Sequence, residues 1–232
     1  MWIPGASARI PGVSDPTLPQ PDRRPTLVVG LLGGVASGKS TVASALAGED
    51  GDVIAADALA QSVLDRPETV DHIRAEFGAE LIGTDGRPDR AALGSRVFAD
   101  PDARARLESW IHPEVRATIR ARLEEGRRRA AAVIVLDVPL LLEHDAQHGL
   151  ANECDALVFV DTPDTAREAR ARADRGWTEG EVARRERAQL SLAEKRRRAD
   201  HVLPNDGTRP ELTAAALALR ARLLEGAEGA PD

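Results

Sequence analysis

The chain has 232 residues, of which 42% are hydrophobic and 30% are charged, and its formal net charge is −7. This length fits one ordinary domain, or one core with helical insertions, and the hydrophobic fraction is enough to bury a core, which excludes disorder of the whole chain. The acidic total argues against a general nucleic-acid or membrane-surface binder. The single cysteine, Cys154, excludes an internal disulfide and a metal site built from cysteines.

The sequence shows no targeting or membrane signal. No apolar run approaches the roughly 20 residues that span a bilayer. The first residues lack the apolar region of a signal peptide. We therefore expect a cytoplasmic protein without a membrane or nucleic-acid partner, as a monomer or a weak homo-oligomer.

The first ordered elements are expected from Thr26 onward. Residues 1–25 are rich in proline and have no hydrophobic period, which predicts a disordered arm. The run TLVVGLL that follows is typical of a buried strand, and a glycine-rich turn then leads into a helical pattern from about Lys39 to Ala47. The segment therefore predicts a strand, a tight loop and a helix.

Further apolar runs lie at 52–57, 131–141, 155–161 and 201–205. They are nearly continuous rather than alternating, so both faces of each strand are expected to be buried, as in a parallel sheet covered by helices. Charged segments with helical spacing separate the runs at 67–130 and 163–200, and a last helix is expected from about Pro210 to Leu224. The fold class is therefore α/β.

The turn after the first strand carries a phosphate-binding pattern. Gly33, four residues, and then Gly38-Lys39-Ser40 match G-x-x-x-x-G-K-[ST] in the required strand-to-helix context. Backbone N–H groups of such a loop point at phosphate oxygens, and the start of the following helix adds positive potential. The residues expected to bind the nucleotide here are Gly33, Ala36, Ser37, Gly38, Lys39, Ser40 and Thr41. The alternative is that a turn rich in glycine and serine matches the pattern by chance.

Lys39 and Ser40 have distinct expected roles. Lys39 is one of two lysines among 31 basic residues. Its compact ammonium can reach the β- and γ-phosphates inside a tight loop, whereas the planar fork of arginine is too broad. The hydroxyl of Ser40 is expected to bind Mg²⁺.

The phosphate loop alone does not identify a reaction. The chain lacks both [NT]-K-x-D and a D-x-x-G switch segment, which argues against a guanine-nucleotide switch. Small-molecule kinases, ATPases and non-catalytic nucleotide sensors remain.

Four further segments resemble the dephospho-CoA kinase family when they are taken in order behind the phosphate loop. They are VIAADALAQSVL (53–64), LGSRVFADPDARARLESWIHPEVR (93–116), VIVLDVPLLLE (133–143) and RRERAQLSLAEKRRRADHVLPNDG (184–207). The resemblance covers about residues 26–207. It implies a P-loop NTPase fold with three α/β/α layers, a five-stranded parallel sheet, a helical substrate-binding insertion (about 66–130) and a helical lid (about 163–200). We expect the whole domain at 26–225, followed by a disordered tail at 226–232.

The resemblance also implies an activity. It is the ATP- and Mg²⁺-dependent phosphorylation of the ribose 3′-hydroxyl of dephospho-CoA, which gives coenzyme A and ADP in the last step of coenzyme A synthesis. Two positions depart from the family pattern. Ala55 stands where the first aspartate of D-x-D is usual, which puts a two-carboxylate mechanism in doubt, and Leu142 stands where an aromatic residue is common.

Two aspartates at the ends of predicted strands are candidates for the chemistry. Asp57 follows the second strand at the sheet edge where ligands of open α/β folds bind, and we expect it to be the base for the 3′-hydroxyl. The competing interpretation is that Asp57 caps a helix beginning at Ala58. Asp137 ends the strand VIVLD and has either a role in ordering water around Mg²⁺ or a structural one.

The predicted lid has 11 basic and 8 acidic residues, which gives 11 − 8 = +3. Most of these side chains are expected to be solvated. The resemblance implies that one lid arginine closes over ATP, with Arg175 the first candidate and Arg172 the second. Asn205 and Gly207 occupy the family's N-x-G position near the adenine, with an ordinary turn as the alternative.

The remaining polar candidates are weaker. His144 and His148 have the spacing of a helical metal pair but lack a third ligand in a segment that resembles a loop. His112 is expected either beside the body of dephospho-CoA or as a helix cap before Pro113. Contacts of Arg96 and Arg116 with the pantetheine or diphosphate stay open, and Trp110 and Phe98 are expected in the core of the insertion.

Two other functions remain as alternatives. One is a different small-molecule or nucleotide kinase on the same fold. The other is a catalytically silent nucleotide sensor, which Ala55 and the proline-rich arm favour and which the intact phosphate loop, Asp57 and the arginine-rich lid oppose.

Overall fold

The structure is a computed structural model that describes residues 26–187 and 189–228. Its centre is a five-stranded sheet in the order β2-β3-β1-β4-β5, and every neighbouring pair is parallel. The strands are β1 (Leu27–Gly33), β2 (Asp52–Ala55), β3 (Val133–Asp137), β4 (Ala156–Asp161) and β5 (His201–Pro204). Four lie inside a predicted apolar run and β1 extends one residue beyond its run, to Gly33, so the five-stranded parallel sheet is confirmed.

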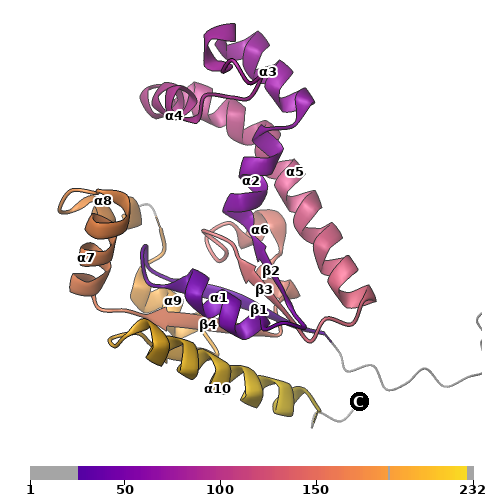
Figure 1. Cartoon of the computed structure of the whole chain (residues 1–232), viewed down its shortest axis with the longest axis vertical. Coiled ribbons are helices and arrows are strands. Elements are labelled where there is room, and N and C mark those ends of the chain that lie inside the picture. Colours follow the sequence, from indigo (N-terminus) through magenta and orange to yellow (C-terminus); the bar gives the residue numbers. More distant parts are fainter. Residues whose placement is uncertain (1–25, 188, 229–232) are drawn as a thin grey trace, which may run out of the picture.

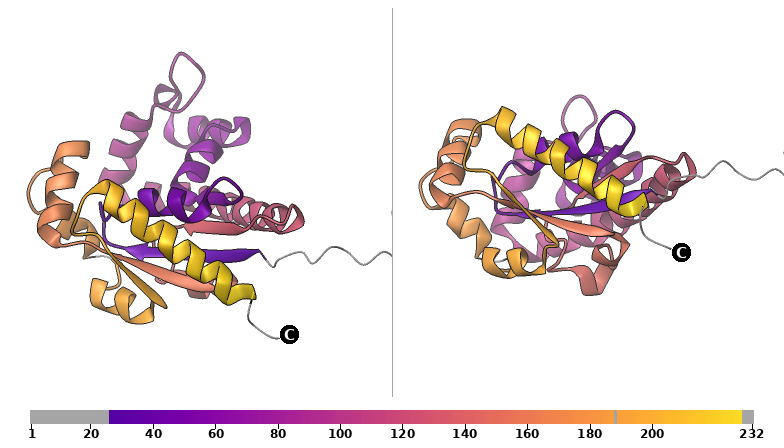
Figure 2. Two further views of the ribbon diagram at one scale, coloured as in Figure 1. Left: turned by 60° about the horizontal axis from the view of Figure 1, so that its bottom comes forward. Right: turned by 90° about the horizontal axis from the view of Figure 1, so that it is seen from below.

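Two hydrophobic cores lie on the two faces of the sheet. Leu27, Val29 and Leu31 of β1 pack on one face with helices α1 (Lys39–Ala47) and α10 (Arg209–Glu228), which lie side by side in Figure 2. Val28 and Leu32 point to the other face and pack with the long helix α5 (Pro101–Arg128). This alternation produces the three α/β/α layers.

The strands are less deeply buried at the two edges of the sheet than at its centre. All seven residues of β1 are buried, whereas β2 and β5 each bury a single residue. A central strand has covered neighbours on every side, but an edge strand keeps one flank toward solvent. Strand β2 still packs on both faces, through Val53 and Ile54, whereas Val202 and Pro204 of β5 are exposed. The prediction of burial on both faces was therefore wrong for β5.

A helical insertion rises from the sheet between β2 and β3 (Figure 1). It contains α2 (Ala56–Leu64), α3 (Pro67–Phe77), the short turn Ala79–Leu81, α4 (Arg90–Ala99) and α5. It has a small core of its own, formed by Ile73, Phe77, Leu81, Leu93 and Ala103. Helix α5 also packs on the sheet through Ile119 and Leu123. The insertion is therefore attached to the sheet by hydrophobic contacts of α5.

Four short helices follow β3 and β4. Helix α6 (Asp145–His148) and the turn Ala151–Glu153 connect β3 to β4, and α7 (Asp164–Arg175), α8 (Glu181–Glu186) and α9 (Leu192–Arg198) connect β4 to β5. In Figure 1, α7 and α8 stand beside the sheet and face the insertion.

The last helix of the described residues is longer than the sequence predicted. Helix α10 extends to Glu228, so the predicted tail at 226–232 begins inside a helix. The predicted arm at 1–25 and residues 229–232 lie outside the described residues. Among the residues that the structure describes, no helix is both long and apolar enough to cross a membrane.

Candidate active site

The phosphate loop lies at the carboxyl end of β1 and leads directly into α1. Gly38 is the residue before the helix and has a φ of 91°, and Ala36 also has a positive φ, of 58°. Glycine takes such a conformation without the steric cost that a side chain adds. The first N–H groups of α1 have no partner inside the helix, so the loop and the helix start offer N–H donors to an anion.

Lys39 folds over this loop. Its Nζ donates to the carbonyl oxygens of Gly34 at 2.9 Å and Gly33 at 3.3 Å. Burial lowers the pKa of Lys39, and the nearby carboxylate of Asp137 opposes that shift. The ammonium is therefore held at the site in a partly desolvated state, in which a bound phosphate would be a strong partner.

Residues that follow β4 and β5 hold the phosphate loop by hydrogen bonds to its backbone. The carbonyl oxygen of Ser37 accepts hydrogen bonds from Oγ1 of Thr162, at 2.8 Å, and from Nδ2 of Asn205, at 2.7 Å. Thr162 follows β4 and Asn205 follows β5, and both are buried. The family resemblance implied that Asn205 lies near the adenine. In the structure its side chain binds the backbone of the phosphate loop at Ser37.

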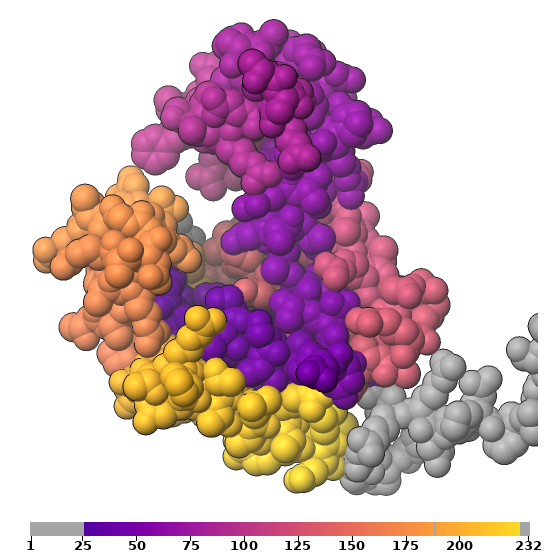
Figure 3. All heavy atoms as spheres, in the orientation of Figure 1, coloured from indigo at the N-terminus to yellow at the C-terminus, as the bar shows by residue number. Residues whose placement is uncertain are grey.

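A cavity of about 1130 Å³ opens above the carboxyl ends of the strands. Figure 3 shows it as a hollow between the insertion and helices α7 and α8. Small-ligand sites typically occupy about 300–1,000 Å³, so this one has room for a large substrate or for two. The predicted residues in its lining are Gly33, Ala36, Ser37, Gly38, Lys39, Ser40, Thr41, Asp57, Arg175 and Asn205. Gly207 is exposed and does not line it.

Two of the carboxylates that line this cavity together with Lys39 lie at or just after the ends of parallel strands. Asp137 ends β3, and Asp57 lies in the first turn of α2 just after β2. Burial raises the pKa of Asp137; the charge of Lys39 lowers it and that of Asp57 raises it. The parallel strand order thus brings Lys39 and Asp57 within electrostatic reach of Asp137.

The helix-cap interpretation of Asp57 was wrong. Helix α2 begins at Ala56, two residues earlier than expected, and its cap position is Ala55, which makes no side-chain cap hydrogen bond. Asp57 is inside the helix and exposed, so its side chain is free of a capping role. Ala55, the departure from D-x-D, is therefore the junction between β2 and α2.

Arginines of α7 and α8 line the cavity wall opposite the insertion. Arg175, at the end of α7, stacks over Trp177 with 4.9 Å from its guanidinium carbon to the ring centre, and Arg185 of α8 approaches the same ring at 4.1 Å. Sequence reasoning missed Arg170, Arg184 and Arg185, which also line the cavity, because a basic helix face is usually only solvated. Arg172 does not line it.

The prediction that Phe98 belongs to the core was wrong. Phe98 is 75% exposed and lines the cavity from the end of α4. The guanidinium of Arg184, across the cavity on α8, lies 5.7 Å from the centre of its ring. Trp110, in contrast, is half-buried against Phe77 in the insertion core, as expected.

The other sequence candidates in the insertion lie outside the cavity. His112 is exposed within α5, which continues through Pro113, so the prediction of a cap before this proline was wrong. Arg96 pairs with Asp100 at 3.4 Å. Neither residue lines the cavity, and nor does Arg116.

His148 is a structural residue of the short helix α6, which lies where the sequence predicted a loop. It is buried at the end of α6, and its Nδ1 accepts the N–H of Leu150 at 3.1 Å. Burial lowers its pKa. Within the described part of the chain, no three histidine, cysteine, aspartate or glutamate side chains are grouped to hold a metal, so His144 and His148 gain no third ligand of these types.

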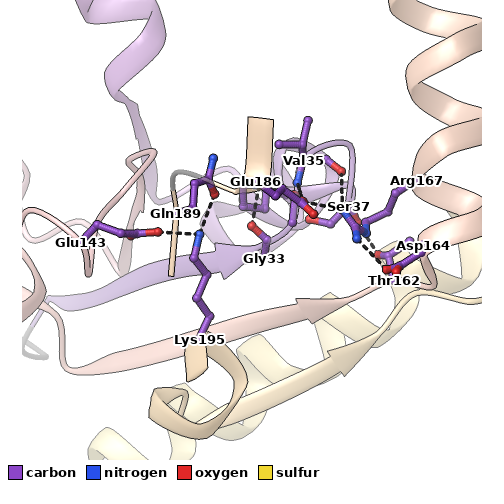
Figure 4. Close-up of polar contacts among 12 residues, drawn as sticks. Gly33, Val35, Ser37, Glu143, Thr162, Asp164, Arg167, Glu186, Gln189 and Lys195 are labelled. Carbon is purple, nitrogen blue, oxygen red and sulfur yellow. Dashed lines mark hydrogen bonds and ion pairs between the residues drawn. The ribbon is translucent and has the colours of Figure 1, made fainter. Parts of the chain in front are cut away.

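A buried polar cluster borders the cavity on the side of β3. Nζ of Lys195 lies 2.9 Å from Oε1 of Glu143 and donates to Oε1 of Gln189 at 2.8 Å (Figure 4). Glu143 also accepts the N–H of Leu190 at 3.0 Å. The sequence identified these residues only as family motif positions; their mutual contact depends on tertiary structure.

The comparisons with known proteins agree with this geometry. The profile of a family described as dephospho-CoA kinase matches residues 27–211. The chain belongs to the dephospho-CoA kinase family. It is 40% identical over 190 residues to the dephospho-CoA kinase of Thermobifida fusca, a match that covers 81% of this chain and 92% of the relative. It is 44% identical over 205 residues to that of Anaeromyxobacter dehalogenans, with 86% and 93% covered.

Solved structures support the same fold. A Thermus thermophilus protein superposes with a TM-score of 0.67 at 37% identity over 86% of this chain and 97% of its own. The dephospho-CoA kinase from Campylobacter jejuni gives a TM-score of 0.63 at 24% identity, over 86% of this chain and 98% of its own, which supports the fold alone. The cavity above the sheet is larger than the usual site for one small ligand.

Proposed function

We propose that this protein transfers the γ-phosphoryl group of ATP to the ribose 3′-hydroxyl of dephospho-CoA, giving coenzyme A and ADP. The observation that carries the proposal is one cavity in a chain of this family, bordered by the phosphate loop, by several arginines and by carboxylates that include Asp57 and Asp137. Phosphoryl transfer depends mainly on positioning and on neutralising charge, and these residue types supply both.

The donor side is built from the phosphate loop. Its N–H groups and the ammonium of Lys39 can hold the phosphates of ATP. The oxygen donors of Ser40 and Asp137, which line the same cavity, are the ligand type that Mg²⁺ prefers, so the residues present fit this ion. When bound, Mg²⁺ neutralises charge on the β- and γ-phosphate oxygens.

The acceptor side is built from Asp57 and the insertion. Asp57 is exposed and lines the cavity, and its proposed role is to accept the proton of the hydroxyl as that hydroxyl attacks phosphorus. Phe98 offers an exposed ring on the insertion side, on which a base such as the adenine of dephospho-CoA can stack. Arg175, Arg184 and Arg185 supply positive charge on the remaining side.

An acceptor panel tests the proposal. ADP release is measured by a coupled assay with dephospho-CoA, adenosine, AMP and shikimate as separate acceptors, and we expect turnover with dephospho-CoA. Lys39→Ala is the control, because loss of the ammonium should reduce turnover by orders of magnitude without unfolding the protein. Preference for another acceptor would indicate a different small-molecule kinase, and nucleotide binding without turnover would indicate a sensor.

A further inference from the structure

A buried ion pair joins helices α7 and α8 directly over the phosphate loop. Nη1 of Arg167, on α7, donates to Oε1 of Glu186, the last residue of α8 (Figure 4). The side chains are only 3% and 16% exposed. Arg167 donates a second bond through Nη2 to Asp164, at 2.6 Å, and its Nε has no hydrogen-bond partner.

Both members of the pair hold the backbone of the loop at Val35. Oε1 of Glu186 accepts the N–H of Val35 at 2.7 Å, and Nη1 of Arg167 donates to the carbonyl oxygen of Val35 at 3.4 Å. The pair lies so close to the loop that a Cβ on Gly34 would stand 2.6 Å from Nη1 of Arg167 and 2.7 Å from Oε1 of Glu186. Residue 34 must therefore lack a side chain for this contact to form.

The charges of the pair have opposite consequences for an anionic ligand. Glu186 places a carboxylate on an N–H group of the loop that binds phosphates, so its charge has the same sign as the ligand. The charge of Glu186 acts on Lys39 in the phosphate loop. It raises the pKa of Lys39, although burial lowers that pKa by more. Arg167 lies against the same carboxylate oxygen and offsets its charge.

We propose that Arg167 and Glu186 are positioning residues that fix the first half of the phosphate loop and, through their opposed charges, set its affinity for the phosphates of the nucleotide. Glu186 holds Val35 and weakens nucleotide binding. Arg167 neutralises the carboxylate of Glu186 and so stabilises it beside the phosphate loop. The inference rests on the proposed function in requiring ATP as the donor, but it does not depend on the identity of the acceptor.

The two single substitutions should shift nucleotide affinity in opposite directions. Arg167→Leu leaves the carboxylate uncompensated beside the loop, so the Kd for ADP and the KM for ATP should rise by about fivefold or more. Glu186→Leu leaves an uncompensated guanidinium, so the Kd for ADP should fall by a similar factor. In the double variant both charges are gone, and the Kd for ADP should return to within about twofold of the wild-type value.

The experiment measures ADP binding by calorimetry at low and high salt, together with thermal melting, for both single variants and the double variant. A purely structural ion pair would lower the melting temperature of both single variants without shifting the ADP affinity in opposite directions. Arg187→Leu and Glu179→Leu are matched controls, because they make the same charge changes at neighbouring exposed residues. Both should leave ADP affinity within about twofold of wild type and should show that net charge alone is not the cause.

Conservative variants keep the test valid if a leucine variant fails to fold. Glu186→Gln retains an oxygen that can accept the N–H of Val35 but removes the charge, so it should still tighten ADP binding. Shifts of ADP affinity in the same direction for both members, or none in either, would overturn the inference. Failure of the proposed function is distinguishable, because the wild-type protein would then bind ADP without phosphorylating dephospho-CoA.

Discussion

Lys39 and Lys195 are the two lysines of a chain that otherwise uses 31 − 2 = 29 arginines. Each places its ammonium in an enclosed polar site: Lys39 on two loop carbonyls, and Lys195 between Glu143 and Gln189. A compact ammonium with three rotatable donors fits such sites, whereas a planar guanidinium needs a wider opening. At these two positions the side chain must therefore be small enough for the site as well as positively charged.

Asp57→Asn tests the proposed base. Asparagine is nearly isosteric but cannot accept a proton, and Asp57 makes no cap contact that the change could disturb. We expect kcat with dephospho-CoA to fall by about 10²-fold or more, with the melting temperature unchanged. Steady-state kinetics and thermal melting give both values, and full kcat in the variant would exclude Asp57 as the base.

Asp137→Asn should change the dependence of stability on pH. Burial raises the pKa of Asp137 above its usual 3.8, so between that value and the raised one the folded state holds more protons than the unfolded state. The contribution of Asp137 to the free energy of unfolding therefore falls as pH rises through this window and stays low above it.

The asparagine variant lacks this titration. Relative to wild type it should gain stability as the pH rises above 3.8, while kcat falls because Lys39 loses a neighbouring carboxylate. Urea unfolding at a series of pH values measures the difference, with Asp85→Asn on an exposed turn as the control. Parallel stability profiles for wild type and Asp137→Asn would contradict the assignment.

Helices α7 and α8 are the elements on which closure of the site would depend. They join the sheet through the ends of the 163–200 segment and carry the arginines of one cavity wall. If the segment closes over ATP, its amide hydrogens should exchange quickly in the free protein and more slowly with an ATP analogue and dephospho-CoA. Hydrogen-exchange mass spectrometry measures this, and unchanged exchange throughout the segment would make it a static part of the wall.

The contact between Lys195 and Glu143 ties α9 to the loop after β3. Both side chains are nearly buried, at 5% and 11% exposure, so removing one member leaves an uncompensated charge. Lys195→Met should lower the free energy of unfolding by about 3–5 kcal/mol. Adding Glu143→Leu should recover much of that loss, and urea denaturation of the single and double variants measures the recovery. A single variant as stable as wild type would show that the pair is effectively solvated.

At the scale of the whole molecule, the cavity is closed on one side by the insertion and on the other by α7 and α8, and Phe98 and Arg184 approach each other across it. A large aromatic side chain that is 75% exposed contributes little to folding. Its place in the wall of a substrate-sized cavity favours a role in binding instead.

Phe98→Ala should therefore separate binding from stability. Stacking of a base on an aromatic ring contributes about 1–3 kcal/mol, so the KM for dephospho-CoA should rise by about tenfold or more while the KM for ATP and the melting temperature stay constant. Leu217→Ala on α10 is the matched control, because Leu217 is also an exposed apolar side chain but does not line the cavity. An unchanged KM for dephospho-CoA would remove Phe98 from the acceptor site.

The sequence by itself determined the strands, the phosphate loop and the family. These features are local: β1 is a continuous apolar run, and the loop pattern is complete within Gly33–Ser40 and lies between a strand and a helix. It also placed Asp57 and Asp137 at one edge of the sheet, because parallel strands end on the same side. Local pattern could not decide that Phe98 is exposed, since an aromatic residue on a helix is usually a core residue.

Only the tertiary structure decided which distant groups support the loop. Glu186 meets Val35 across 151 residues of chain, and Asn205 meets Ser37 across 168. In the sequence, Arg167 and Glu186 are two charges in a basic, helical segment, where the expected location of a charge is solvent. They are buried because the sheet order brings the end of β4, and with it α7, beside the phosphate loop after β1. Hydrophobic periodicity specifies which face of an element is covered, but the pairing of polar groups depends on where the covered elements finally meet.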